Sequence, residues 1–140
     1  MSNSNVGKEC DFTVPANRPL YVSVHNEEKW KRTVKVVLDR KETQQIEVPP
    51  GGIQGSVYPV VKGAKSGDTR SVQVQMYDSQ NGQMQLGWIP TQTLGNGKYV
   101  NIGGQKDYPS GGGTYQPEQG LNDATITVYW STVAQPGASS

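Results

Sequence analysis

Ala124-Thr125-Ile126-Thr127-Val128-Tyr129-Trp130 is the stretch that decides the fold, because apolar side chains alternate along it with threonines and a tyrosine. Successive side chains of a β-strand point to opposite faces, so the apolar residues of this stretch share one face. The pattern predicts a strand with one face in a core and the other toward solvent.

The same alternation recurs along the chain in short runs separated by turn residues, which include 17 glycines and 9 prolines. Many short strands at regular spacing, with no helical periodicity, are typical of a sandwich. We therefore predict an all-β, antiparallel β-sandwich of about nine strands. The expected strands cover residues 11–14, 20–25, 33–38, 44–48, 53–61, 71–77, 83–89, 98–102 and 124–130.

The length of 140 residues is that of one domain with one core. We predict a single β-sandwich domain over residues 11–133, preceded by an N-terminal extension over 1–10 and followed by a flexible C-terminal tail over 134–140. The only cysteine, Cys10, cannot form a disulfide within the chain.

Charge and hydropathy exclude several classes of function. The formal net charge is only +1, whereas binding to a phosphate backbone needs a basic stripe, so we expect no nucleic-acid partner. No apolar run approaches the roughly 20 residues of a membrane span. The first residues lack the basic and apolar regions of a signal peptide, so we expect a cytoplasmic protein, or one released without a conventional signal.

The sequence also argues against an enzyme. His25 is the only histidine, and no serine or cysteine motif near it marks a nucleophile and its base. A histidine on an alternating strand is more typical of a half-exposed sheet residue. Glycoside hydrolysis uses a pair of carboxylates that meet only in the folded chain, so this alternative stays open from sequence alone. We predict no enzymatic activity.

The long segment Gly103–Asp123 is the candidate for a binding function, because loops of this length in compact domains are functional or disordered. It carries oxygen ligands in Asp107, Glu118, Asn122 and Asp123, directly before the last strand. Calcium and polyhydroxyl ligands both require such oxygens. The alternative is that Asn122-Asp123 only form an Asx turn that starts the strand.

Several segments, taken in order, resemble the calcium-dependent fucose/mannose-binding bacterial lectins of the PA-IIL type. They are Phe12-Thr13-Val14-Pro15-Ala16-Asn17, a valine-rich strand reaching Asn26, Thr33-Val34-Lys35-Val36, Val72-Gln73-Val74-Gln75, and Leu121-Asn122-Asp123-Ala124 leading to Val128-Tyr129-Trp130. The resemblance implies a nine-stranded sandwich, usually a homodimer. It also implies a site in which two calcium ions bridge carboxylates and sugar hydroxyls.

The resemblance assigns roles to particular residues. Its sugar-binding set is Asn26, Glu27, Glu28, Asp107, Glu118, Asn122 and Asp123, and its metal ligands are Asn26, Glu118, Asn122 and Asp123. The stretch Glu27-Glu28-Lys29 occupies the position that tunes sugar choice, and Asp107 that of an acidic residue touching the sugar.

The chain departs from this family pattern at the metal ligands. Lys106 stands where the family has a glutamate, Gly120 where it has an aspartate, and the chain continues past Trp130 instead of ending in a ligand glycine. Three carboxylates opposed by a lysine do not balance two Ca²⁺ ions, and uncompensated buried charge is costly. We therefore expect at most one calcium ion, or none. The predicted function is a lectin with a degenerate site that binds fucose- or mannose-like or other sugars; the alternative is a structural or interaction module that has lost sugar binding.

Overall fold

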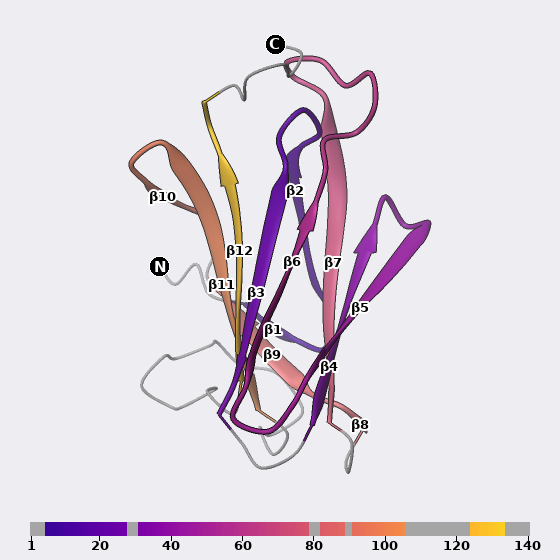
Figure 1. The fold of residues 1–140 in the computed structure, drawn as a ribbon, viewed down its shortest axis with the longest axis vertical. Helices are drawn as coiled ribbons and strands as arrows, with labels where there is room; N and C mark the ends of the chain where they lie inside the picture. Colours follow the sequence, from indigo (N-terminus) through magenta and orange to yellow (C-terminus); the bar gives the residue numbers. More distant parts are fainter. Residues whose placement is uncertain (1–4, 28–30, 79–81, 89–90, 106–123, 134–140) are drawn as a thin grey trace.

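The computed structural model describes residues 5–27, 31–78, 82–88, 91–105 and 124–133. Within these ranges the chain forms twelve strands and no helix, and all strand pairs are antiparallel (Figure 1). The described residues therefore contain no helix that is long and apolar enough to cross a membrane. The expected all-β antiparallel sandwich is confirmed.

One sheet has seven strands in the order β1-β9-β11-β12-β3-β6, with β10 paired to β11. Strand β12, at its centre, is the alternating stretch of the sequence with one residue added. The members are β1 (Asn5–Gly7), β3 (Leu20–Asn26), β6 (Ile53–Tyr58), β9 (Gln85–Trp88), β10 (Gln92–Leu94), β11 (Gly97–Gln105) and β12 (Ala124–Ser131).

The other sheet has five strands in the order β2-β7-β4-β5, with β8 paired to β7. The members are β2 (Cys10–Pro15), β4 (Arg32–Leu38), β5 (Glu42–Val48), β7 (Thr69–Asp78) and β8 (Gly82–Gln83). The run expected over 53–61 ends as β6 at Tyr58, before Pro59, and β6 is an edge strand. Proline has no amide hydrogen to donate to a ladder, which explains this boundary.

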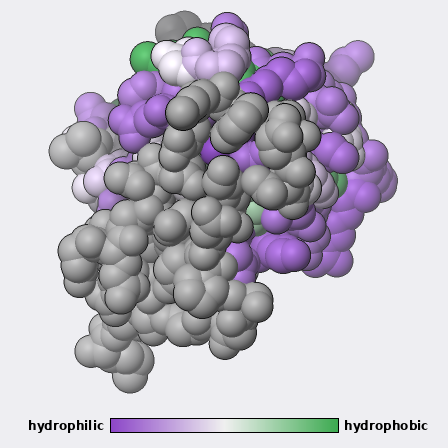
Figure 2. Space-filling model, turned by 90° about the horizontal axis from the view of Figure 1, so that it is seen from below, coloured by the Kyte–Doolittle hydropathy of each residue, from purple (hydrophilic) through white to green (hydrophobic). Residues whose placement is uncertain are grey.

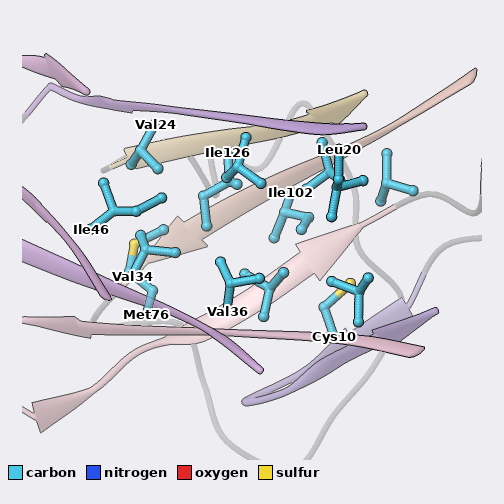
Figure 3. Packing of buried hydrophobic residues seen from close by; sticks show 14 of the residues in the cluster. Cys10, Leu20, Val24, Val34, Val36, Ile46, Met76, Ile102 and Ile126 are labelled. Carbon is cyan, nitrogen blue, oxygen red and sulfur yellow. The ribbon is translucent and has the colours of Figure 1, made fainter. Parts of the chain in front are cut away.

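The core lies between the two sheets and is built from the inward residues of both (Figure 3). Ile126 and Ile102 face Val36 and Met76 across it, and all four are buried. Strand β12 shows strict alternation of buried and exposed residues, as its sequence predicts. Cys10 is also a core residue, and burial raises the pKa of its thiol above the ordinary value.

The chain differs from the expected strand list around Met84. The Asn81-Gly82 dipeptide between the expected strands 71–77 and 83–89 favours a hairpin of the two, but in the described residues only the short β8 pairs with β7. After Met84 donates its amide to the Met76 carbonyl (2.8 Å), the chain enters the other sheet as β9. This crossing keeps Leu86 in the core. Within 1–10, the expected extension, β1 pairs with β9.

Candidate functional site

Two predicted site segments are anchored at one end of the sandwich, the lower end in Figure 1. Strand β3 ends there at Asn26, and β12 begins there at Ala124. Asn26 and Ala124 are register partners, so Asn26 lies beside the residue that follows Asp123. The sheet therefore places the start of the first predicted segment beside the end of the second.

Asn26 is fully buried and ties β3 to the turn that follows β5. Its amide nitrogen Nδ2 donates to the carbonyl oxygens of Val48 (3.3 Å) and Pro49 (3.2 Å), and its backbone N–H donates to Gly52 O (2.9 Å). These bonds fix which branch of the side-chain amide is nitrogen. The oxygen Oδ1, the atom that a cation or a sugar hydroxyl requires, is the other branch.

The turn that Asn26 holds follows from its sequence, Pro49-Pro50-Gly51-Gly52. Gly52 N–H donates to Pro49 O (3.0 Å), and Gly51 has φ of +69°. Proline followed by a residue with positive φ is the arrangement of a type II turn, and glycine adopts that φ without strain. The local sequence thus places the two carbonyl groups that orient Asn26.

A buried ion pair lies at the same end. Arg32 Nη1 is 2.9 Å from Asp78 Oδ2, and both side chains are 0% exposed. Arg32 begins β4 and is the register partner of Val48 on one side and of Asp78 on the other. The pair therefore joins β4 to β7 directly beside the carbonyl group to which Asn26 donates.

Arg32 and Asp78 were not among the predicted site residues, although the sequence carries a signal for their pairing. Arg32 has the same parity as Val34 and Val36, and Asp78 has the same parity as Val74 and Met76. Arg32 and Asp78 therefore fall at inward-facing positions, where a charged residue is unusual. Because a buried charge must be paired, an arginine and an aspartate at two such positions indicate an ion pair.

The remaining predicted ligands divide into one described residue and several outside the described ranges. Glu27 is described: its Oε1 lies 3.8 Å from His25 Nδ1, and both side chains are about half exposed. The half-exposed state expected for His25 is confirmed. Glu28, Asp107, Glu118, Asn122 and Asp123 lie outside the described residues, as does Lys106. Within the described ranges, no group of three or more His, Cys, Asp or Glu side chains could hold a metal ion.

Figure 2 looks directly onto this end of the molecule. The described residues visible in its upper and right parts are predominantly hydrophilic, with a few pale and green residues at the top. A hydrophilic surface is compatible with a hydroxyl-bearing ligand, which exchanges hydrogen bonds with water for hydrogen bonds with protein.

The two packed sheets place the chain in the class of antiparallel β-sandwiches. Among solved structures the chain is similar to a high-affinity mannose-binding lectin from Ralstonia solanacearum, with 18% sequence identity and a TM-score of 0.58. The likeness covers 86% of this chain and 94% of the lectin chain. No family model and no curated protein matches the sequence. At this identity the likeness establishes the fold.

Proposed function

We propose that the protein is a non-enzymatic lectin that binds fucose- or mannose-like sugars at the lower end of the sandwich. The observation that carries the proposal is the pairing of Asn26 with Ala124, which joins the two predicted ligand segments. The fold-level likeness to a mannose-binding lectin supports it. The proposed sugar contacts come from Asn26-Glu27-Glu28 on one side and from Asp107, Glu118, Asn122 and Asp123 on the other.

We propose that the site holds at most one calcium ion, with Asn26, Glu118, Asn122 and Asp123 as ligands. The described geometry fits at one point, because the Asn26 amide nitrogen is committed to Val48 and Pro49. In this proposal the ligand atom of Asn26 is the other branch of the amide, the oxygen Oδ1. A bound calcium ion coordinates oxygen atoms and supplies a positive charge to which sugar hydroxyls bind.

The proposal is tested by calorimetric titration with mannose and with fucose, in calcium and again in EDTA. We expect saturable binding to one of the two sugars, and loss of that binding in Asp123→Asn. Asp11→Asn is the matched control, because Asp11 is exposed on β2 and an asparagine oxygen can still accept from Gln73 Nε2 (3.1 Å). Equal loss in both variants, or no binding in the wild type, contradicts the proposal.

Comparing the titrations in calcium and in EDTA shows whether sugar binding requires a calcium ion. Binding in calcium that disappears in EDTA indicates that at least one ion is required. Equal binding in both conditions indicates a metal-free site. A stoichiometry of two calcium ions per chain contradicts the charge argument.

The alternative function is a structural or interaction module on the same sandwich. It predicts no signal for any sugar on a glycan array, with or without calcium. One reproducible sugar that competes in solution excludes this alternative.

We also propose a homodimer that packs through the outer face of the seven-stranded sheet. Val57, Tyr21 and Tyr129 are successive register partners across β6, β3 and β12, and they are 60%, 40% and 38% exposed. The Tyr21 and Tyr129 rings lie 6.1 Å apart, and a Cβ at Gly97 would collide with the Tyr129 ring. Tyrosine is enriched in protein interfaces.

Charge favours a second copy as the partner on this face. The described outward positions of β6, β3, β12 and β11 carry no Lys, Arg, Asp or Glu. They are Ile53, Gly55, Val57, Tyr21, Ser23, His25, Thr125, Thr127, Tyr129, Ser131, Gly97, Tyr99, Asn101 and Gly103. A two-fold dimer brings one patch against its own copy, so an uncharged patch meets no repulsion.

A further inference from the structure

A hollow of about 210 Å³ lies at the upper end of the sandwich, the end opposite Asn26. It is bordered by the β2–β3 turn, by the turn before β7, and by the adjoining ends of β11 and β12. Figure 1 shows these connections together at the top of the molecule, where β12 ends. The hollow is therefore separate from the proposed sugar site.

The lining of this hollow has cations without acids. Arg18 and Lys98 both line it, and none of its lining residues is Asp or Glu. In the described part of the chain, neither cation has a carboxylate within ion-pair distance. The nearby carboxylate of Asp68 instead accepts from the Lys65 amide (2.9 Å). The charge of the two cations is thus uncompensated by described residues.

One nitrogen of the Arg18 guanidinium is held by a hydrogen bond, and another is left to donate to a ligand. Its Nη1 donates to the Asn17 carbonyl (3.1 Å), which fixes the guanidinium at the turn. Its Nε is covered from solvent and has no hydrogen-bond partner among the described residues. A half-buried arginine with a fixed fork is suited to an oxyanion, because guanidinium geometry matches paired oxygens.

Lys98 reaches the hollow because it occupies one of the positions of β11 whose side chains point toward the other sheet. It is the register partner of Trp130, whose side chain is buried and also lines the hollow. Lys98 thus occupies a core-facing position at the start of β11, yet it is exposed. Ser66 and Thr132 also line the hollow, and the side chain of each carries a hydroxyl group that can donate a hydrogen bond.

We propose that this hollow binds a phosphate or sulfate group, either as the free ion or carried on a monosaccharide. Its volume of about 210 Å³ leaves room for one tetrahedral oxyanion with part of its hydration. The two cations neutralise the charge, and the hydroxyls donate to the remaining oxygens. A metal cation or an amine is repelled by the same lining.

The test is a set of NMR titrations of the labelled protein at constant ionic strength, with chloride as the balancing anion. The probes are inorganic phosphate, inorganic sulfate, mannose 6-phosphate and mannose. We expect saturable shifts at the amides of Gly67, Lys98 and Thr132 with an anionic probe. A response to the free ions identifies the ion itself as sufficient; a response to mannose 6-phosphate alone identifies a sugar-borne group.

Variants distinguish a built site from general attraction of anions. Arg18→Gln and Lys98→Gln are each expected to weaken the response at least tenfold, and Lys98→Arg is expected to retain it. Lys41→Gln, at an exposed position before β5, is the control with the same charge change. Equal weakening by Lys41→Gln, or linear shifts without saturation, overturns the proposal.

The outcome is independent of the proposed lectin function. Mannose binding that fails in the wild type while phosphate shifts persist removes the lectin proposal alone. Mannose binding that persists without any response to phosphate, sulfate or mannose 6-phosphate at Gly67 and Lys98 removes the oxyanion site alone.

Discussion

The two ends of the sandwich, at the two ends of β12, differ in whether their charged side chains are buried and paired. At the lower end, Arg32 is fully buried and paired with Asp78, while the neighbouring Lys31 is exposed and lies 2.9 Å from Glu47. At the upper end, Arg18 and Lys98 line an open hollow whose lining has no acid. The difference indicates that the buried charge pair at the lower end holds β4 against β7, whereas the two cations at the upper end are available to a ligand.

The largest effect should come from breaking the lower pair. Asp78→Ala leaves the Arg32 guanidinium buried without its carboxylate, which should cost about 3–5 kcal/mol of unfolding free energy. Urea denaturation measures it. The double variant Arg32→Met/Asp78→Leu should be markedly more stable than the single one, since it leaves no buried charge. A single-variant loss below about 1 kcal/mol would show that the pair does not hold this end.

Asn26 should contribute the next largest effect at the same end. Asn26→Ala removes the donor to the Val48 and Pro49 carbonyls and should destabilise the fold by about 1–3 kcal/mol. Asn101→Ala is the matched control, because Asn101 is exposed on β11 and accepts from Thr127 Oγ1 (2.9 Å). Its loss should stay near about 0.5 kcal/mol. Equal losses in the two variants would remove the special status of Asn26.

A substitution on the outer face of the seven-stranded sheet should weaken the dimer without changing ligand binding at either end of the sandwich. Tyr21→Lys places like charges against each other in a two-fold dimer, so its dissociation constant should rise at least tenfold, or about 1.4 kcal/mol. Sedimentation equilibrium measures this, with Lys35→Gln on the other sheet as control. A wild type that is monomeric, or a dimer that Tyr21→Lys leaves intact, contradicts the proposed face.

The upper cations should have the smallest effect on stability. Lys98→Gln should change the unfolding free energy by no more than about 0.5 kcal/mol, because the side chain is exposed and has no described carboxylate partner. Thermal denaturation compared with Asp78→Ala measures the contrast. A loss approaching that of the buried pair would mean that the upper end also uses its charge for folding.

Strand β12 shows how far local pattern predicts this fold. Its alternation alone identifies the buried face, because burial on one side of a sheet imposes a period of two. The crossing at Met84 was not predictable in this way. The Asn81-Gly82 turn favours a hairpin locally, while the choice of sheet depends on partners such as β11 that are distant in sequence. Strands of three residues, such as β1 and β10, are too short to show a period.

The residue types of the candidate site were predictable from the sequence, but the contacts that hold these residues in place were only partly so. The sequence places Asn26 and the oxygen-rich segment before Ala124 as separate features, and the β3–β12 register brings their ends together. The bonds from Asn26 to Val48 and Pro49 depend on a turn 23 residues away. Such contacts follow from the packing of β3 against the end of β5, which no local pattern encodes.

The central claim is that sugar binds at the lower end of β12, and one measurement addresses it directly: the amide chemical shifts of the labelled protein during titration with mannose or fucose in calcium. The account predicts saturable shifts at Asn26 and Ala124, with no change at Gly67 and Lys98. Absence of shifts at Asn26 and Ala124 for both sugars, or shifts confined to the upper end, would contradict it.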